Sequence, residues 1–510
     1  RQLDDMPGHP RLLWVLPYRA SIDAARDRFI KSLLPAPGQK KPDIGVLHAT
    51  AARTLLARAT TDDCPPGPRQ ARKARDQAAA MRLFAQRIRV ATPYQLLRGA
   101  IAGPSHSSVL LEQANALIAL DELHAYDPAT FGRLCAAMRL WQMLGSRVAV
   151  LSATLAPPMI DLLKDTLDQV TVHRAPPGTA PDRHRLVLDD QPITAPQSLD
   201  RIRRWLTEGH SVLVVANTVA TAQRLYRELA GHARAVLPDD PDAAILLHSR
   251  FRAEDRAAIE RRISTRHPER AVGENTRRGG LVVATQVLEV SLCLDFDRGV
   301  SELAPIEAVA QRAGRVNRRG RHPDGVVEFR VHMPESALPY EEGALDAALS
   351  ALRNTPSPVI SEQTVETWLR HAYDTEWGRQ WASQAERHRK EFFESFLTFC
   401  DPFHDRTEHA TGLDEAFDSI EVLLESDAEE YSLRSSGPHG DPLQAAGLLI
   451  PLRKAQIHRL HRNGRAHLDR ERARRERRPP LWLINAPYSE ETGLDLSAEA
   501  TSPRQPETIL

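Results

Sequence analysis

The sequence predicts an α/β protein with two parallel-sheet lobes in tandem, followed by a mainly helical C-terminal region. Three observations support this prediction. Short apolar runs rich in Val, Ile and Leu recur along the first 335 residues, each run is flanked by a helical pattern, and the Pro- and Gly-rich segment Arg174–His184 divides the series. Buried strands that alternate with helices are typical of parallel sheets covered on both faces.

The expected elements follow in chain order. In the first lobe the strands are predicted at Leu12–Pro17, Ala116–Leu120 and Val148–Leu151, and their helices at Ser21–Leu34, Pro128–Leu144 and Pro157–Leu167. In the second lobe the predicted strands are Ser211–Ala216 and Leu281–Thr285, and the helices are Val219–Ala230 and Ala253–Thr265. Pro128 suits the first turn of its helix and Gly145 suits the end.

The domain boundaries are placed where these patterns break. Arg174–His184 interrupts both periodicities and is interpreted as a linker between the lobes. A second break falls near Pro334–Pro339, and beyond it the strand signal fades. We therefore expect a first lobe over residues 1–178, a second over 179–335, and a linker with a helical accessory domain over 336–510.

Composition and charge exclude several classes of protein. Of the 510 residues, 42% are hydrophobic, which is enough for buried cores and excludes a disordered chain. The net charge is +0, from 67 basic and 67 acidic side chains, which excludes a uniformly basic surface. No apolar run approaches the roughly 20 residues that span a bilayer, which excludes an integral membrane protein. The four cysteines form no CxxC pair, so a reducing cytoplasmic compartment is expected.

The most informative segment is Ala116–His124, where an apolar run ends in Asp121 and Glu122 and His124 follows two residues later. A buried parallel strand would deliver the two carboxylates to its carboxyl end, where ligands bind in open α/β sheets. One carboxylate can then hold Mg²⁺ while its neighbour orients an attacking water, with His124 on the γ-phosphate side. An ordinary helix N-cap is the alternative, because capping and the helix dipole also favour acidic residues.

Three further polar motifs occur downstream, and the first two directly follow apolar strands. Ser152-Ala153-Thr154 lies in the first lobe, and Thr285–Ser291 and Gln311–Arg321 lie in the second. In the last motif, arginines recur every three residues and could converge on one anion; they are Arg312, Arg315 and Arg318. Arginines brought by a second domain stabilise the charge of a transferring phosphoryl group. A surface helix rich in arginine is the alternative.

The order DELH, SAT, TQVLEVS and QRAGRVNRRG resembles a superfamily 2 helicase of the DExH type. Within that superfamily the sequence most resembles the CRISPR-associated helicase–nuclease of type I systems. The narrower resemblance rests on four segments, 213–218, 246–250, 284–297 and 302–307, and the whole covers residues 11 to 330. It implies two RecA-like lobes and ATP-driven translocation on single-stranded DNA during CRISPR interference. The implied partner is a guide-RNA surveillance (Cascade) complex.

The resemblance also implies residue roles. Asp121 holds Mg²⁺, Glu122 activates the hydrolytic water, and His124 belongs to the same site. Gln311, Arg315 and Arg318 face ATP from the second lobe, whereas Ser152 and Thr154 couple hydrolysis to lobe movement. The residues implied to contact the nucleic-acid backbone are Pro17, Arg19, Thr92, Pro93, Thr218, Ser249, Arg250 and Thr285. For each Ser or Thr, a turn or cap role is the alternative.

Two departures from the family pattern bear on the ATP site. No lysine follows a glycine, so the Gly-Lys-Ser/Thr phosphate loop is absent from the sequence. The chain begins with Arg1 rather than Met, so we expect a fragment that lost this loop before the strand at Leu12–Pro17 and hydrolyses ATP poorly. Cys293 stands where the family usually has an Asp expected near the ribose, although Asp295 and Asp297 are close in sequence.

The family's nuclease is a metal-dependent HD domain, fused or separate. The sequence has one His-Asp pair, His404-Asp405, with His409 nearby, and a polar loop is the favoured interpretation. We therefore expect the HD nuclease elsewhere. Two charged stretches remain: Asp414–Glu430 has eight acids and no base, and Arg453–Arg478 has eleven bases and three acids. They either pair with each other, or the basic stretch binds DNA or the surveillance complex.

The alternatives to this function are a superfamily 2 helicase that acts on RNA or in repair, and a catalytically silent fragment that only binds nucleic acid. Stimulation of ATP hydrolysis by single-stranded DNA, compared with RNA, separates the first alternative from the main prediction. A phosphate loop encoded within about 40 residues upstream of Arg1 would argue against the second.

Overall fold

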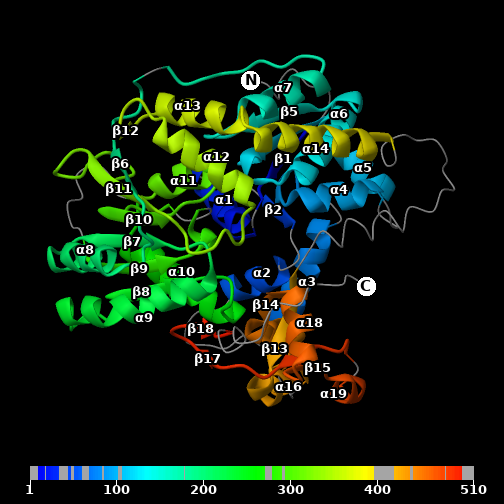
Figure 1. Cartoon of the computed structure of the whole chain (residues 1–510). Helices are drawn as coiled ribbons and strands as arrows, with labels where there is room; N and C mark the ends of the chain where they lie inside the picture. The colour runs from blue at the N-terminus through cyan, green and yellow to red at the C-terminus, as the bar shows by residue number, and fades with distance from the viewer. Residues whose placement is uncertain are drawn as a thin grey trace. The chain divides into compact units, whose positions relative to one another are not determined.

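The computed structural model describes residues 10–17, 19–33, 44–47, 51–59, 68–82, 86–101, 106–176, 178–269, 278–289, 293–394, 419–436, 440–476 and 478–496. The chain divides into two compact units, each made of segments that are distant in sequence. Unit 1 comprises Arg1–Asp190, Glu289–Asp295 and Leu303–Phe417, and unit 2 comprises Gln191–Leu288, Phe296–Glu302 and Asp418–Leu510. Figure 1 labels the helices and strands of both units.

Unit 1 begins with a five-stranded parallel sheet in the order β2-β3-β1-β4-β5. Its strands are β1 (Arg11–Val15), β2 (Ile44–Leu47), β3 (Ile88–Ala91), β4 (Ala116–Asp121) and β5 (Arg147–Leu151). The helices that accompany it are α1 (Arg19–Ser32), α2 (Ala51–Ala59), α3 (Pro68–Arg82), α4 (Pro93–Ile101), α5 (His106–Gln113), α6 (Pro128–Met143) and α7 (Pro157–Thr166). Because all five strands are parallel, their carboxyl ends lie at one edge of the sheet.

The α6 helix is fixed by its sequence at both ends. Asp127 caps its start, because the side chain accepts a hydrogen bond of 3.0 Å from the backbone N–H of Thr130, and Pro128 occupies the first turn. Gly145, at φ 78°, follows the end of the helix in the left-handed region that glycine adopts without strain. Most of α6 is buried, so the helix is a central part of the core rather than a surface helix.

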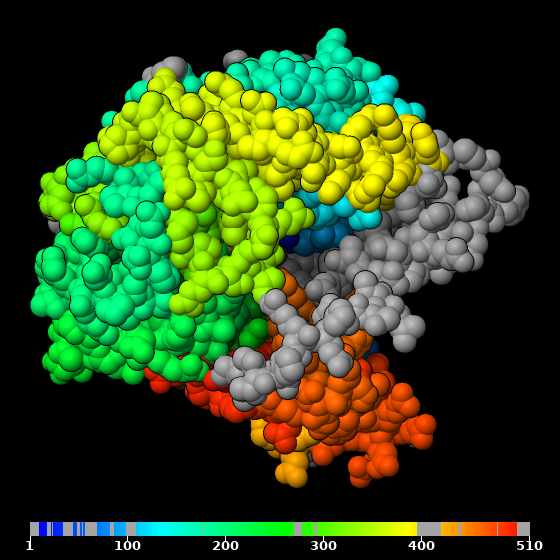
Figure 2. Space-filling model, in the orientation of Figure 1, coloured from blue at the N-terminus to red at the C-terminus, as the bar shows by residue number. Residues whose placement is uncertain are grey.

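The remaining elements of unit 1 come from later in the chain. Three strands form the order β12-β6-β11; they are β6 (His184–Asp189), β11 (Val327–His332) and β12 (Val359–Ile360). The helices are α11 (Ile306–Ala313), α12 (Glu342–Arg353), α13 (Glu362–Tyr373) and α14 (Glu376–Phe392). α14 packs on α6 so closely that a side chain at Gly132 would collide with the backbone at Ala385. Figure 2 shows the other flank of α14, in yellow, at the molecular surface.

Unit 2 contains four parallel strands in the order β10-β7-β9-β8. They are β7 (Ser211–Val215), β8 (Ala244–Leu247), β9 (Gly280–Ala284) and β10 (Arg298–Glu302), and the helices are α8 (Pro196–Thr207), α9 (Val219–Val236) and α10 (Ala253–Arg266). Every residue of β7, β8 and β9 is buried, as expected for uninterrupted apolar runs in a parallel sheet.

Residues 419–496, here called the C-terminal subdomain, also belong to unit 2. Four short strands form a mixed sheet in the order β14-β13-β16-β15, namely β13 (Ser419–Leu424), β14 (Ile450–Arg453), β15 (Ala466–Leu468) and β16 (Trp482–Ile484). Its helices are α16 (Ala428–Ser436), α17 (Pro442–Ala445), α18 (Lys454–Arg462) and α19 (Arg470–Arg475). A hairpin of β17 (Tyr488–Ser489) and β18 (Gly493–Leu494) follows. The core gathers side chains such as Val422, Ile450, Ile457 and Ile484.

The predicted α/β fold with parallel sheets is confirmed, and the strands and helices proposed from sequence occur within a few residues of their expected bounds. The helical prediction for the C-terminal region is met by α12, α13 and α14, but the mixed sheet of the C-terminal subdomain was not foreseen. Its strands are only three to six residues long and lie among charged residues. The domain boundaries at residues 178 and 335 stay predictions. Within the described residues, no helix is both long and apolar enough to cross a membrane.

Candidate functional site

The DELH motif lies at the carboxyl edge of the five-stranded sheet. Asp121 is the last residue of β4, and Glu122 follows it with a left-handed backbone at φ 56° and ψ 41°. A non-glycine residue in this region costs about 1–2 kcal/mol, so the surrounding structure must hold it there. The backbone N–H of Glu122 donates to the Leu151 carbonyl at 3.0 Å, which fixes the turn against β5. Glu122 occupies the N-cap position of the short 3-10 helix Leu123–Ala125, but its side chain makes no capping hydrogen bond there.

Asp121 is held from the neighbouring strand. The indole Nε1–H of Trp14, on β1, donates to Asp121 Oδ2 at 3.2 Å. Burial raises the pKa of Asp121, and the Trp14 hydrogen bond opposes part of that rise. The indole donor thus orients the carboxylate and favours its ionised form, which is the form that binds a divalent cation.

Glu122 lies in the field of two arginines from the fourth motif. Burial raises its pKa, and the Asp121 charge adds to the rise, whereas Arg315 and Arg318 lower it. All four residues belong to unit 1. The structure therefore brings the carboxylates of β4 together with arginines that follow them by almost 200 positions in the chain.

His124 joins three of the predicted motifs by hydrogen bonds. Its Nδ1 lies 2.7 Å from Ser152 Oγ, and its Nε2 lies 3.2 Å from the side-chain nitrogen of Gln311. Because an amide nitrogen can only donate, Nε2 accepts, and Nδ1 carries the hydrogen that goes to Ser152. Burial lowers the pKa of His124 to about 4, so the imidazole is neutral near pH 7. The neutral ring thus links the DELH, SAT and arginine-rich motifs.

The two coupling residues occupy the turn after β5. Ser152 Oγ accepts a second hydrogen bond, at 3.3 Å, from the backbone N–H of Thr154. Thr154 is buried, and among the residues described its Oγ1 has no hydrogen-bond partner. The turn is therefore organised around Ser152, which connects it directly to His124.

The three arginines of the fourth motif have different surroundings. Arg312 is 1% exposed; its Nε donates to Glu289 Oε1 at 2.7 Å, and its Nη2 donates to the Tyr340 hydroxyl at 3.0 Å. Arg315 donates to the backbone carbonyl of Glu289, and the backbone N–H of Arg318 donates to Asp295 at 2.9 Å. Arg312 is thus occupied by protein groups, which leaves Arg315 and Arg318 as the candidates for contact with an anion.

The buried donor of Arg315 fits a bound phosphate. Burial lowers the pKa of Arg315 to about 10, so it stays charged near pH 7. Its Nε is buried without a hydrogen-bond partner among the described residues. An unsatisfied buried charged donor costs free energy, and a phosphate oxygen is a group that would satisfy it. Together with Asp121 as a cation ligand, these residues fit a nucleotide phosphate with Mg²⁺.

The acidic residues near Cys293 are engaged with the backbone. Cys293 is exposed and free, whereas Asp295 is 2% exposed and accepts the Arg318 amide. Asp297 is 1% exposed and accepts from the backbone N–H and the hydroxyl of Ser211 at 2.9 and 2.8 Å. Each of the two carboxylates thus accepts hydrogen bonds from another segment of the chain.

The first-lobe residues predicted to grip nucleic acid lie at the carboxyl edge of the five-stranded sheet. Pro17 follows β1, and Thr92 and Pro93 follow β3; the Leu16 amide donates to the Ala91 carbonyl at 3.0 Å, so the two strand ends are adjacent. Thr92 is half-buried and Pro93 is buried at the start of α4. Arg19 begins α1, but its side chain lies outside the described residues.

The second-lobe residues lie at the corresponding edge of unit 2. Val215, Leu247 and Ala284 end their strands and are level in the register, so the segments that follow them start side by side. Ser249 and Arg250 are half-buried after β8, and Thr285 is buried after β9. The Thr218 hydroxyl accepts the Thr221 amide at 3.1 Å, so it caps α9 as the alternative interpretation proposed.

The possible HD pair His404-Asp405 lies outside the described residues. Within the part of the chain that the structure describes, no group of three or more His, Cys, Asp or Glu side chains is placed to hold a metal ion. The single carboxylate of Asp121 is not such a group, since Mg²⁺ usually takes one or two carboxylates together with phosphates and waters.

Sequence reasoning missed two residues of the site. Glu289 binds both Arg312 and Arg315, and it lies within the quoted TQVLEVS motif, so its place in that motif was an available signal. Trp14 could not be found in this way, because only the pairing of β1 with β4 brings it next to Asp121.

The fold consists of RecA-like parallel-sheet lobes in tandem, with polar motif residues at the carboxyl edges of the parallel strands. Residues 208–321 match the family model described as "CRISPR-associated nuclease/helicase Cas3, C-terminal". The chain is 30% identical over 388 residues to the CRISPR-associated endonuclease/helicase Cas3 of Thermus thermophilus, a match that covers 62% of this chain and 40% of that protein. A putative Cas3 of Myxococcus xanthus is 31% identical over 263 residues, covering 50% and 32% of the two chains.

Solved structures show the same fold. The crystal structure of T. fusca Cas3 with ADP has a TM-score of 0.69 and 21% identity, over 95% of this chain and 63% of that one. A chain of a CRISPR RNA-guided surveillance complex, in a pre-nicking state, has a TM-score of 0.60 and 21% identity, over 95% and 66%. These matches confirm the resemblance to CRISPR helicases of the Cas3 type. The chain spans 46% and 43% of two archaeal Cas3 relatives that it also matches, so it corresponds to less than half of their length.

Proposed function

We propose that this chain is the helicase part of a type I CRISPR-associated enzyme, an ATP-dependent translocase on single-stranded DNA that acts in antiviral interference. The observation that supports this proposal is the network around His124. Neutral His124 is hydrogen-bonded to Ser152 and Gln311. The neighbouring Glu122 has a pKa that the charges of Arg315 and Arg318 lower. One imidazole therefore connects Gln311 of the arginine-rich motif with the turn after β5, and it lies 3.6 Å from the Glu122 carboxylate.

The proposed chemistry divides between the two carboxylates. Mg²⁺, when bound, neutralises phosphate charge, and the residue that would hold it is Asp121, oriented by Trp14. Glu122 accepts the proton of the attacking water, and its raised pKa brings its basicity closer to the working pH. Neutral His124 accepts from Gln311 rather than repelling the neighbouring arginines, as a charged ring would.

Arg315 and Arg318 stabilise the charge on the phosphate oxygens of ATP. The guanidinium of Arg315 is already positioned by the Glu289 carbonyl, so little reorganisation is needed when a phosphate meets its remaining donor. Ser152 transmits the movement of the site during hydrolysis to the turn after β5. If Gln311 or His124 is displaced, the hydrogen bonds of Ser152 to His124 and to Thr154 change. We propose that this turn couples hydrolysis to movement of the lobes.

The strand-end residues form the nucleic-acid contacts of this proposal. Pro17, Arg19, Thr92 and Pro93 serve the first lobe, and Ser249, Arg250 and Thr285 serve the second, with Thr218 acting through its helix cap. Backbone amides, hydroxyls and arginines suit a single strand, because they bind phosphates without reading sequence. The proposed partners are a guide-RNA surveillance complex and a fused or separate HD nuclease, and the proposed compartment is the cytoplasm.

The test compares ATP hydrolysis with and without nucleic acid, in a protein that carries this chain together with a phosphate-binding loop. We expect stimulation by single-stranded DNA well above that by RNA of the same length, and loss of turnover in Glu122→Gln. The 510-residue chain alone is expected to hydrolyse ATP slowly, because it contains no Gly-Lys-Ser/Thr sequence. Equal or greater stimulation by RNA would favour an RNA helicase. Nucleic-acid binding without turnover would favour a silent binding protein.

A further inference from the structure

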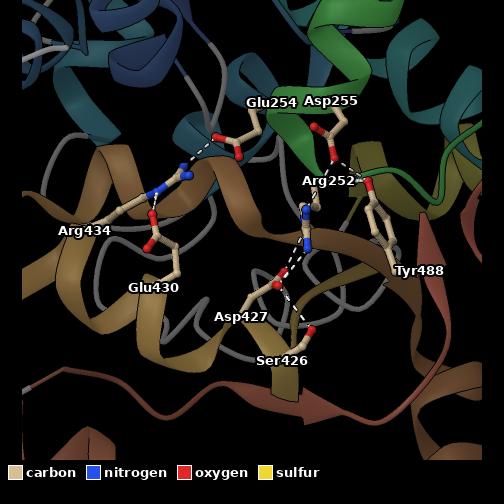
Figure 3. Close-up of polar contacts among 8 residues, drawn as sticks. All are labelled: Arg252, Glu254, Asp255, Ser426, Asp427, Glu430, Arg434 and Tyr488. Atoms are coloured by element: carbon tan, nitrogen blue, oxygen red, sulfur yellow. Dashed lines mark hydrogen bonds and ion pairs between the residues drawn. The ribbon is translucent and has the colours of Figure 1, made fainter. Parts of the chain in front are cut away.

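The C-terminal subdomain is attached to α10 by an ion-pair cluster, shown in Figure 3. Arg252, just before α10, makes a two-pronged ion pair with Asp427 in the subdomain, at 2.8 Å from Nε and 2.7 Å from Nη2. The Tyr488 ring lies 4.4 Å from the same guanidinium, and its hydroxyl donates to Asp255 at 2.5 Å. Arg252 is therefore clamped on two sides by residues that follow it by more than 170 positions.

A second attachment lies beside the first. Arg434 donates to Glu254 of α10 and to Glu430 of its own helix, each at 2.7 Å (Figure 3). The backbone N–H of Ala253 donates to the Leu449 carbonyl at 3.0 Å. Paired forks of this kind are directional, so together they fix the orientation of the subdomain on α10 as well as its position.

The β17–β18 hairpin continues from this cluster to the loop after β8, which holds the proposed nucleic-acid contacts Ser249 and Arg250. The Leu494 amide donates to the Arg250 carbonyl at 2.9 Å, and His248 Nε2 lies 3.0 Å from the Thr492 carbonyl. His248 Nδ1 accepts the Arg250 amide at 3.1 Å. Both backbone polar groups of Arg250 are thus fixed, one by the hairpin directly and the other through His248.

The hydrogen bonds define the state of His248. A carbonyl can only accept and a backbone N–H can only donate, so Nε2 carries the hydrogen and Nδ1 is bare. The side chain is fully buried and stacks on Phe251 with ring centroids 4.4 Å apart. Burial lowers the pKa of His248 to about 3, which agrees with a neutral ring that serves as a rigid connector.

We propose that the β17–β18 hairpin is a positioning element for nucleic-acid binding, which sets the conformation of the Ser249–Arg250 loop through His248 and the Arg250 carbonyl. This inference rests on the proposed function, because it assigns the loop to a single-stranded DNA contact. The C-terminal subdomain then does more than accompany the second lobe. Its hairpin completes a loop that β8 alone does not hold.

The Gly493→Ala substitution tests the proposal, because it adds one methyl group at the contact between the hairpin and the loop. Gly493 has φ 69°, and a Cβ there would lie 2.5 Å from His248 Cε1 and 2.8 Å from the Arg250 carbonyl oxygen. Gly464 in the same subdomain has the same φ of 69°, but a Cβ there would have no atom within 4 Å among the described residues. Alanine therefore introduces the same backbone strain at both positions, and only Gly493→Ala also pushes the hairpin away from the loop.

The experiment uses the 510-residue chain with a fluorescein-labelled single-stranded oligodeoxythymidine as the probe. For Gly493→Ala we expect affinity to fall about five- to tenfold, the effect of removing one hydrogen bond. Backbone amides of Arg250 and Leu494 should exchange hydrogen about tenfold faster. Gly464→Ala should match the unchanged chain in affinity and in exchange at both amides.

A second variant keeps the proposal falsifiable if Gly493→Ala does not fold. In His248→Asn the amide oxygen still accepts the Arg250 N–H, but the bond to Thr492 is removed, so affinity should fall to a similar degree with an unchanged circular dichroism spectrum. Faster exchange at Leu494 with unchanged affinity in a folded variant would overturn the inference, because the hairpin would then be structural only. If the unchanged chain and Arg250→Ala both fail to bind the probe, the proposed function is wrong and the inference falls with it.

Discussion

Replacing Glu122 with Gln should separate catalysis from folding at this site. The substitution keeps the shape of the side chain and its left-handed backbone, but it removes the charge and the proton acceptor. Loss of a general base lowers turnover by about 10²- to 10⁴-fold. ATP affinity should change little, since the side chain accepts a proton from water and makes no phosphate contact in the proposed site.

The same variant should show a defined pH dependence of stability. Burial and Asp121 raise the pKa of Glu122 in the folded protein, so ionising this group costs folding free energy. That cost is absent below the unfolded pKa, grows as the pH rises from the unfolded to the folded pKa, and is fully present above the folded pKa. Gln does not ionise, so Glu122→Gln should equal the parent at low pH and gain stability relative to it as the pH rises toward neutrality.

Two assays check this prediction. Phosphate release is measured in a protein that carries this chain with a phosphate-binding loop, and thermal unfolding of the 510-residue chain is followed from acidic to neutral pH. Glu122→Asp is the matched control, because it keeps a carboxylate but shortens its reach. Equal turnover in Glu122→Gln and the parent would show that the base lies elsewhere. A loss of stability at neutral pH would show that the ionised carboxylate is mainly a partner of the arginines.

Three other predictions follow from named contacts. Arg315→Ala should lower ATP turnover by about 10³-fold or more without loss of fold. Arg312→Ala should mainly destabilise the protein, because it removes the buried partner of the partly buried Glu289 carboxylate. Comparing turnover with melting temperature distinguishes the two variants, and the reverse pattern would exchange their roles. Asp427→Ala should destabilise unit 2 by about 2 kcal/mol in chemical unfolding, since half-buried Arg252 loses both charged hydrogen bonds and keeps the longer ion pair with Asp255 at 3.8 Å. A change under about 0.5 kcal/mol would make the Asp427 pair an ordinary surface ion pair. The exposed arginines of α19 are Arg470, Arg474 and Arg475. Neutralising them should make the slope of log affinity for single-stranded DNA against log salt shallower by about 0.7 for each phosphate contact that is lost. An unchanged slope would exclude a DNA role for this helix.

The two charged stretches near the C-terminus, Asp414–Glu430 and Arg453–Arg478, were predicted from their charge either to pair with each other or to leave the basic stretch for DNA or the surveillance complex. In the acidic stretch, Asp427 forms an ion pair with Arg252 and Glu430 forms one with Arg434. Both of these arginines lie outside the basic stretch. Within the basic stretch, Arg478 pairs with Asp469 and Glu476 of its own segment. Equal and opposite charges favour direct pairing of the stretches, and one contact joins them, because His467 Nδ1 lies 3.3 Å from Glu425 Oε1. The arginine pairs named above instead follow local and inter-element contacts.

The sequence alone was enough to predict the parallel-sheet architecture and the motif residues at the strand ends. Buried parallel strands must be continuously apolar, so β4, β7 and β9 are visible as runs, and polar residues directly after them must lie at the carboxyl edge. Spacing within one motif therefore placed Asp121, Glu122 and His124 correctly on a strand end and the turn after it.

Only the tertiary structure decided which side chains meet. Trp14 and Asp121 are 107 residues apart, His124 and Gln311 are 187 apart, and His248 and Thr492 are 244 apart. No local periodicity encodes such pairs, because they depend on strand order and on the path of connecting segments. The mixed sheet of the C-terminal subdomain was hidden for a related reason. Its short strands share one apolar core, which includes Val422, Ile450 and Ile484, and their pairing order is set by tertiary contacts between segments far apart in the chain.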